Sequence, residues 1–229
     1  MEILDGLVKA FQLIISGDPT LYEITLRSLF VSGTTTLIST LWGIPIAVFL
    51  GLRNFRGKFL VKGFFNALIG IPTVALGLIL YLIFSRVGPL GFLHILYTPT
   101  AIIIGQAILV TPIIVSLATT AIEAIDPEIM NLAKTLGASE TQAALAVLKE
   151  ALNGIFLAGI ASFNRAIAEL GIALMVGGNI AGLTNVLTTT ISNETAKGNI
   201  ALGIALAVIL IVLVFGINLT LNIIQRRKK

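Results

Sequence analysis

Five long apolar stretches constrain this chain more than any other feature. They cover approximately residues 26–52, 63–84, 100–122, 151–176 and 200–224. Each is long enough to cross a hydrocarbon core of about 30 Å as a helix, which takes about 20 apolar residues. Hydrophobic residues make up 56% of the chain and charged residues only 11%, whereas soluble domains carry about 25% charged residues. The sequence therefore predicts one all-α integral membrane domain, residues 1–229, with five transmembrane helices.

The N-terminal segment, about residues 2–16, differs from the five stretches. Its apolar residues recur at helical spacing, but Asp5, Lys9 and Gln12 lie between them. It is too short and too polar to span, so an interfacial amphipathic helix is predicted, with a flexible tail as the alternative. It has neither a basic leading region nor a small-residue cleavage pattern, and we expect no removable signal peptide. A turn at residues 16–19 follows, after which Pro19 can begin the next helix.

Lysine and arginine residues are distributed unequally between the two ends of the apolar stretches. One set lies in the first and third connections and the tail: Arg53, Arg56, Lys58, Lys62, Lys134, Lys149, Arg226, Arg227, Lys228 and Lys229. The opposite set is Lys9, Arg27, Arg86 and Lys197. Because basic residues concentrate on the cytoplasmic side, the N-terminus is predicted outside and the C-terminus in the cytoplasm. This asymmetry also explains the net charge of +4 without a nucleic-acid partner.

Several kinds of chemistry lack the residues that they require. The chain has no cysteine and a single histidine, His94, so thiolate and multi-histidine metal sites are excluded. No pair of carboxylates and no Ser/His/Asp set has a spacing that suggests hydrolysis. Residues 32–36 are rich in hydroxyls but lack the lysine of a phosphate loop. We therefore expect no enzyme activity, cofactor or metal in this chain, and we expect these hydroxyls to pack helices together.

The polar stretch 126–139 is predicted to form a short cytoplasmic helix, about residues 127–137. Asp126 suits the N-cap and Pro127 the first helical position. Gly137 is placed to end the helix in a left-handed conformation. Residues 139–142, Ser-Glu-Thr-Gln, then read as a capping box that opens another helix. A short amphipathic helix between two membrane segments is typical of a docking element.

Three prolines lie inside the apolar stretches. Pro45, Pro72 and Pro112 each remove a backbone hydrogen bond at membrane depth, which is tolerated where neighbouring groups satisfy the freed carbonyls. One interpretation is that they kink helices around a translocation path, with Pro72 and Thr73 at a gate. The alternative is ordinary kinked packing.

Arg165 and Glu169 are ionisable residues within the fourth stretch. Their i, i+4 spacing places them on one helix face, where they can pair. Charged residues within a membrane normally face a protein interior or water. A structural or gating pair is favoured over direct contact with a substrate, and a cationic element lining a path for anions is the remaining alternative.

The stretch 126–139 resembles the cytoplasmic coupling motif of ABC importer permeases. Asn131, Leu132 and Ala133 stand at the positions of that family's Glu-Ala-Ala run, and Gly137 stands at its glycine, followed by Ala138-Ser139. The departures are Asn131 for Glu, Leu132 for Ala, and residues 148–149, Leu-Lys, where Leu-Pro is usual.

A second resemblance narrows the family. Residues 163–171 and 175–180 resemble the corresponding segment of molybdate and tungstate permeases. The run through residues 188–198 is closest to the tungstate branch. Residues 71–77, Ile-Pro-Thr-Val-Ala-Leu-Gly, resemble the helix that carries the cytoplasmic gate in oxyanion permeases. Together the resemblance covers roughly residues 28–224.

The resemblance implies a MetI-like, type I ABC importer permease in a prokaryotic plasma membrane. It further implies a homodimer, two cytoplasmic ATPase subunits that bind ATP and Mg, and an external oxyanion-binding protein. The expected ATPase-coupling residues are Asp126, Pro127, Glu128, Ile129, Asn131, Leu132, Ala133, Lys134, Leu136, Gly137, Ala138 and Ser139. Among them, Ile129, Leu132 and Leu136 are expected to be the apolar anchors.

Two alternatives remain open at this point. The cargo could be molybdate, sulfate, phosphate or an amino acid instead of tungstate, because selectivity resides largely in the binding protein. A secondary transporter or channel would need no ATPase. That class predicts more membrane-embedded carboxylates for ion coupling, and only Glu169 qualifies.

Overall fold

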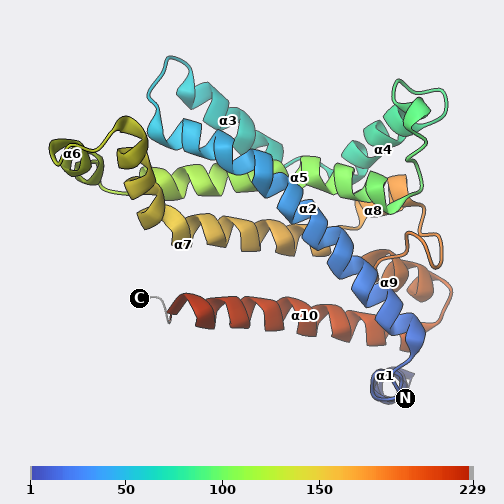
Figure 1. Cartoon of the computed structure of the whole chain (residues 1–229). Helices are drawn as coiled ribbons and strands as arrows, with labels where there is room; N and C mark the ends of the chain where they lie inside the picture. The colour runs from blue at the N-terminus through green and yellow to red at the C-terminus, as the bar shows by residue number, and fades with distance from the viewer. Residues whose placement is uncertain (1, 227–229) are drawn as a thin grey trace. The chain divides into compact units, whose positions relative to one another are not determined.

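A computed structural model describes residues 2–226, and this part of the chain contains helices and no strand. Figure 1 shows the course of the chain. The helices are α1 (Glu2–Ile15), α2 (Pro19–Leu52), α3 (Lys58–Ile69), α4 (Thr73–Phe84), the 3-10 turn η1 (Gly91–Leu93), α5 (Pro99–Glu123), α6 (Pro127–Thr135), α7 (Glu140–Ile167), α8 (Gly171–Gly177), α9 (Leu187–Ala196) and α10 (Ile200–Arg226). The predicted all-α class is confirmed. Arg227, Lys228 and Lys229, used above for the orientation, lie outside the described residues.

The chain divides into two compact units. Unit 2 consists of Thr36–Ile71 and Ala107–Arg165, and unit 1 holds the other described residues. The boundaries pass through α2, α5 and α7, so each of these helices contributes to both units.

Four helices are long and apolar enough to cross a membrane: α2, α5, α7 and residues 200–220 of α10. The broken pair of α3 and α4 makes a fifth if it counts as one span. The chain is thus a multi-pass membrane protein. α2 begins at Pro19, as the turn at residues 16–19 predicted, and so starts before the apolar stretch 26–52. The Asp18 carboxylate caps it by accepting from the N–H groups of Thr20 (2.8 Å) and Leu21 (3.3 Å).

Two of the predicted spans are not single helices. The stretch 63–84 is interrupted, since α3 ends at Ile69 and α4 begins at Thr73. Pro72 lacks an N–H and disfavours helical backbone at Ile71, and Pro72 itself is extended, with φ −64° and ψ 118°. The stretch 151–176 also breaks, because α7 ends at Ile167 and α8 begins at Gly171. Pro45 and Pro112, in contrast, lie inside continuous helices.

Small residues bring the helices of unit 2 close together. Ala47 of α2, Ala118 of α5 and Ala158 of α7 form one buried cluster. A Cβ atom built on Gly154 would lie 2.4 Å from the Cβ atom of Ala121, so only glycine fits at that crossing. Such contacts are typical of membrane helix packing, where small side chains let backbones approach closely.

Buried hydroxyls of α2 satisfy backbone groups of α5, as the sequence predicted. In unit 1 the Thr35 hydroxyl donates to the Ile103 carbonyl at 3.4 Å, and in unit 2 the Ser39 hydroxyl donates to the Ala107 carbonyl at 3.2 Å. These residues pack helices and do not form a phosphate loop.

Unit 1 has its own apolar core. α10 packs against α1 and α9 (Figure 1). Buried residues from α2, α9 and α10 form the cluster Leu21, Ile24, Leu187, Ala205 and Leu206. Leu13 and Ile14 of α1 pack against this cluster, whereas Phe11 and Ile15 are exposed. The predicted N-terminal helix is present as α1 over Glu2–Ile15, and its place at the membrane interface stays a prediction.

Candidate functional site: the α6 surface and the α4–α8 contact

Helix α6 has the N-cap and the terminal glycine that its sequence predicts. The Asp126 side chain accepts a hydrogen bond from the Glu128 N–H at 2.9 Å, and Pro127 takes the first helical position. The helix runs Pro127–Thr135, two residues shorter than expected. Its last turn closes over Gly137 (φ +86°), where the Ala138 N–H donates to the Ala133 carbonyl at 3.0 Å. The helix therefore has fixed ends.

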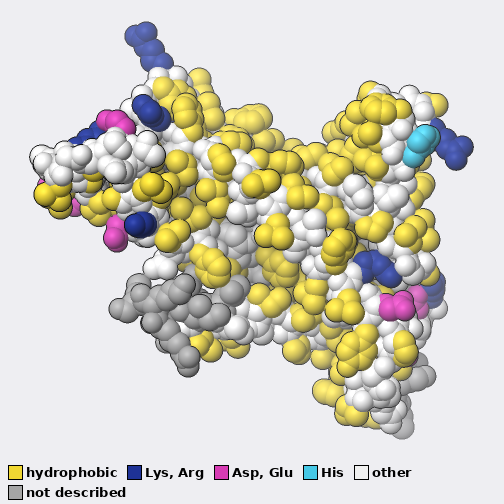
Figure 2. Space-filling view, in the orientation of Figure 1, with side chains coloured by type: hydrophobic (Ala, Val, Ile, Leu, Met, Phe, Trp, Pro, Cys, Tyr) yellow, Lys and Arg dark blue, Asp and Glu magenta, His cyan; other side chains and the backbone are white. Residues whose placement is uncertain are grey.

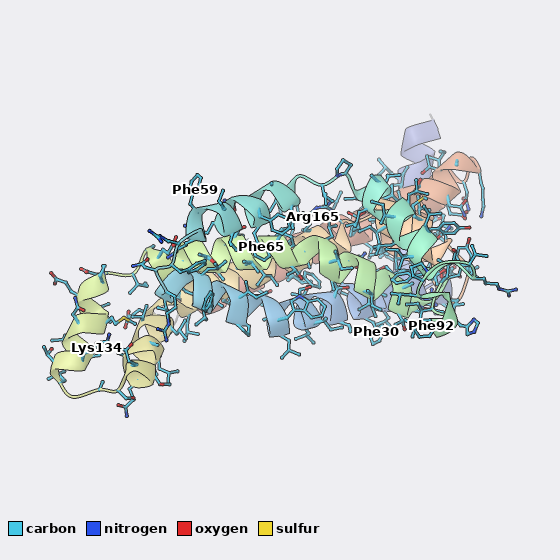
Figure 3. All side chains as sticks on the ribbon, turned by 90° about the horizontal axis from the view of Figure 1, so that it is seen from above. Phe30, Phe59, Phe65, Phe92, Lys134 and Arg165 are labelled. Atoms are coloured by element: carbon cyan, nitrogen blue, oxygen red, sulfur yellow. The ribbon has the colours of Figure 1, made fainter. Side chains whose placement is uncertain are left out.

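The start of α7 is tied to α6. The Ser139 N–H donates to the Gln142 side-chain oxygen at 2.8 Å, and the Gln142 N–H donates to the Ser139 hydroxyl at 3.3 Å. This is the predicted capping box. Lys134 pairs with Glu140 at 2.7 Å, and Figure 3 shows Lys134 at this α6–α7 corner. The capping-box hydrogen bonds and the Lys134–Glu140 ion pair together hold the α6–α7 corner.

The apolar arc of α6 divides between two environments. Ile129 and Met130 pack against a buried cluster of Ile122, Val147 and Ala151, which belongs to α5 and α7. Ile129 was predicted to be an apolar anchor for the ATPase together with Leu132 and Leu136. In the structure Ile129 instead packs against the chain's own core. The sequence pattern missed Met130, whose position 100° around the helix from Ile129 still falls within the wide apolar arc.

The other side of the arc faces outward. Leu132 is 62% exposed and Leu136 81% exposed. The polar residues Glu128, Asn131, Lys134 and Ser139 are also exposed. We call Leu132, Leu136 and these four residues the α6 surface. An exposed leucine pair on a rigid, buttressed helix has the composition of a docking surface, with an apolar centre and a polar rim.

An ion cluster near α6 was not anticipated from the sequence. Glu123, at the end of α5, pairs with Lys58 at 3.0 Å and with Lys62, both on α3. The i, i+4 spacing of the two lysines was a usable signal, since it places them on one face of a helix. The cluster fastens the beginning of α3 to the end of α5.

In unit 1, Pro72 and Thr73 lie where α4 meets α8. Pro72 is the N-cap of α4, and Thr73 is its first residue. A Cβ atom built on Gly171, the first residue of α8, would lie 2.6 Å from the Thr73 hydroxyl and 2.9 Å from the Val74 nitrogen. The helices are close again one turn on, where a Cβ atom on Gly77 would lie 2.9 Å from the Cβ atom of Met175. The starts of the two helices are therefore packed too closely to admit a side chain at either glycine.

Glu169 has a structural role that its sequence context did not reveal. It is 2% exposed, and its carboxylate accepts from the Ile172 N–H at 3.0 Å, which caps the first turn of α8. The Thr188 hydroxyl donates to the Glu169 carbonyl at 2.7 Å, which links the starts of α8 and α9. The predicted helix face shared with Arg165 is wrong, because α7 ends at Ile167 before Glu169 is reached. Arg165 lies in the last turn of α7, and its pairing with Glu169 stays a prediction.

Arg27 holds the connection between α8 and α9, a role that sequence reasoning missed. Its guanidinium donates to the Gly182 carbonyl at 2.9 Å, to the Asn185 carbonyl at 3.0 Å and to the Asn185 side chain. Two further bonds brace this connection, because the Thr184 hydroxyl donates to the Gly177 carbonyl at 2.6 Å and accepts from the Ile180 N–H at 2.8 Å.

Comparison with known proteins identifies the family. Residues 43–229 match the family described as "Binding-protein-dependent transport system inner membrane component". The chain belongs to this family. A member of it serves a transport system that depends on a binding protein. The predicted resemblance to ABC importer permeases is therefore confirmed.

Named relatives of this family member include tungstate permeases. It is 39% identical to the tungstate uptake system permease protein TupB of Peptoclostridium acidaminophilum, over 97% of this chain and 98% of the relative. It is 35% identical to the TupB protein of Campylobacter jejuni, over 98% of this chain and 94% of the relative. The sulfate transport system permease protein CysT of Escherichia coli is 27% identical, over 90% of this chain and 76% of the relative. The chain thus resembles tungstate permeases along nearly its whole length.

Solved structures agree on the fold of this permease. A structure described as inward-facing conformations of the MetNI methionine ABC transporter matches with a TM-score of 0.75 at 21% identity, over 91% of this chain and 96% of that chain. A structure described as an amino acid ABC transporter with histidines matches with a TM-score of 0.71 at 20% identity, over 95% of this chain and 98% of that chain. The predicted MetI-like permease fold is confirmed.

Proposed function

We propose that this chain is the membrane-spanning permease subunit of an ATP-driven tungstate importer. The observation that carries the proposal is its similarity to two tungstate uptake permeases from end to end. Other oxyanion permeases are more distant. The molybdate/tungstate permease WtpB of Pyrococcus abyssi, for example, is 32% identical over only 69% of this chain. Molybdate is the second candidate cargo, on the strength of that same relative.

The proposal assigns energy input to a separate subunit. The family is one of membrane components that work with a binding protein, and the sequence holds no phosphate loop. Two cytoplasmic ATPase subunits would bind ATP and Mg, and an external binding protein would deliver the anion. A second copy of the chain would complete the path, because most homo-oligomers are closed two-fold dimers. The basic asymmetry supports an N-terminus outside the cytoplasm, and the family of inner membrane components supports a prokaryotic plasma membrane.

The α6 surface is the proposed contact for the ATPase. Leu132 and Leu136 would enter an apolar groove, and the polar residues around them would line its rim. The opposite side of α6 is anchored through Ile129 and Met130 to α5 and α7. A displacement of the ATPase would therefore reach two spanning helices through packed side chains, which transmit strain because interiors are close-packed.

Alternating access is the proposed transport mechanism. The break at Pro72 divides the second apolar stretch into two helices that need not move together, and the tight α4–α8 contact carries α8 along with α4. Helix breaks at membrane depth are tolerated where the backbone lines a cavity or is covered by protein. Switching would change which side of the membrane can reach the path. Glu169 would hold the starts of α8 and α9 in register during this change.

Reconstitution tests the function directly. The chain is co-purified with its ATPase and binding protein, placed in liposomes, and assayed for uptake of tungstate, molybdate and sulfate, with and without ATP on the ATPase side. The proposal predicts uptake that requires ATP and the binding protein and prefers tungstate. Uptake without ATP would indicate a secondary transporter or channel, and a preference for sulfate or molybdate would reassign the cargo.

A further inference from the structure

Segment 53–62 and the rest of α3 form a surface that the chain's own core does not cover. No residue of α3 is buried, although eight of its twelve residues are apolar in the sequence KFLVKGFFNALI. Phe59 is 85% exposed, and Phe64 and Leu60 are largely exposed as well. Figure 3 shows the Phe59 side chain pointing away from the helix bundle. Such a continuous apolar face in water would be unfavourable, which indicates that lipid or another apolar partner covers it.

The same segment carries excess positive charge. Four basic residues lie within ten positions: Arg53, Arg56, Lys58 and Lys62. The carboxylate of Glu123 pairs with both lysines, and Glu140 is a second acid within electrostatic reach of Arg53. The four cations still outnumber the acids. Arg53 and Arg56 are exposed, and no ion pair to either is found among residues 2–226. Figure 2 shows basic side chains beside hydrophobic ones at the α2–α3 connection.

The order of these residues along the chain matches a membrane boundary. Segment 53–62 directly follows α2, a candidate spanning helix that ends at Leu52. Aromatic rings favour the boundary between headgroups and acyl chains, and arginine favours the headgroup phosphates. Basic residues next to a spanning helix attract anionic lipids. Charge, aromatic rings and position therefore point to one class of partner.

We propose that segment 53–62 is a binding site for anionic lipid headgroups. Arg53 and Arg56 contact the phosphates, while Phe59 lies in the adjoining acyl region. The lysines remain committed to Glu123, so a lipid bound here is coupled to the end of α5. α6 begins four residues later, at Pro127. Anionic lipid would thereby stabilise the position of the α5–α6 connection. The proposal does not depend on the cargo or on the ATPase.

Lipid-selective fluorescence quenching tests the site. The chain has one tryptophan, Trp42, so the double variant Trp42→Phe/Phe59→Trp carries a single reporter at the proposed site. The full chain is placed in bilayers of phosphatidylcholine and phosphatidylglycerol in which one lipid at a time is brominated. The proposal predicts stronger quenching by brominated phosphatidylglycerol than by brominated phosphatidylcholine. The affinity of the site for phosphatidylglycerol should exceed that for phosphatidylcholine on the order of fivefold at low salt.

Matched variants assign the effect to the two arginines. Adding Arg53→Gln/Arg56→Gln should bring the ratio of the affinities for phosphatidylglycerol and phosphatidylcholine close to one. The control Arg86→Gln changes an exposed arginine of another connection, and it should leave this ratio unchanged. A reporter at Phe215 on α10 (Trp42→Phe/Phe215→Trp) should not distinguish the two lipids, because segment 205–225 has no charged residue. Equal quenching of the Phe59→Trp reporter by both lipids would overturn the proposal.

Two further measurements keep the proposal testable. Native mass spectrometry of the natural chain should retain more phosphatidylglycerol than the Arg53→Gln/Arg56→Gln chain does, and this comparison needs no tryptophan variant. In the complex with the ATPase, the Phe59→Trp reporter should remain accessible to brominated lipid. Loss of quenching by both lipids on ATPase binding would instead assign the surface to a protein partner and overturn the proposal.

Discussion

Gly137 is the residue that most sharply limits the end of α6. Its φ of +86° lies in the left-handed region, while a Cβ atom built on it meets nothing within 4 Å. Substitution is therefore opposed by backbone strain, of about 1–2 kcal/mol for an ordinary side chain, and not by crowding. Asparagine tolerates this conformation better than a β-branched residue does.

From this follows a paired prediction at Gly137. Gly137→Val should distort the α6–α7 corner and lower the amount of tungstate carried per ATP hydrolysed by several fold, with normal membrane insertion. Gly137→Asn should keep most of the coupling. The measurement compares uptake and ATPase rates in liposomes. Normal coupling in the valine variant would contradict the assigned role of this corner.

Glu169 offers a second test at the residue scale. Because its carboxylate accepts from the buried Ile172 N–H, Glu169→Ala should leave that donor unsatisfied and cost about 1–3 kcal/mol of stability. Glu169→Gln should cost less, since the amide oxygen can still accept the bond. Thermal unfolding of the purified chain in detergent measures both. If glutamine is as damaging as alanine, the negative charge matters more than the cap.

The individual helices show where sequence reasoning succeeded and where it failed. The end of α6 and the two N-caps could be predicted because Asp126, Gly137 and Ser139 act through neighbouring backbone groups. The break at Ile69–Thr73 was not predicted, since Pro72 was read as a kink within one long apolar run. The end of α7 was missed for a different reason. It depends on a buried cap from Glu169 and a close approach of Gly171 to α4, and both are tertiary contacts.

Glycines of α7 provide a matched pair for testing helix packing. A Cβ atom on Gly154 would lie 2.4 Å from the Cβ atom of Ala121, whereas one on Gly159 would meet nothing within 4 Å. Gly154→Ala should therefore destabilise the chain by about 1–3 kcal/mol, and Gly159→Ala should be neutral or slightly stabilising. Thermal unfolding of the two variants decides this. Adding Ala121→Gly should rescue Gly154→Ala, and failure to rescue would contradict the assigned contact.

The α6 surface predicts a loss of partner binding at the scale of an element. Leu132→Ser/Leu136→Ser removes its apolar centre, and buried anchors commonly contribute more than 1 kcal/mol each to an interface. Affinity for the ATPase should fall at least about tenfold, while the fold persists because neither leucine is buried. Val87→Ser, at an exposed residue of another connection, is the control. Unchanged affinity in a titration with purified ATPase would remove α6 as the contact.

For the whole molecule, composition and apolar length were sufficient to predict a multi-pass helical protein. The resemblance of residues 126–139 and 163–180 to known permeases was sufficient for the family. The division into two units could not be read from the sequence, because its boundaries pass through α2, α5 and α7, which continue as helices across them. The sequence also did not show which apolar residues of α6 are covered. Ile129 and Leu132 are both large aliphatic residues, and they differ only in that α5 and α7 cover Ile129 and leave Leu132 exposed.

The central claim is that energy for transport enters this chain from a separate ATPase through α6. Since the chain has no cysteine, the single variant Leu136→Cys gives an unambiguous cross-linking site. With a short thiol-reactive photo-cross-linker attached there, the assembled transporter should yield a permease–ATPase adduct whose amount changes when ATP is added. Val87→Cys should yield none. A transporter that hydrolyses ATP and imports tungstate, yet gives no adduct through Leu136→Cys, would contradict the account.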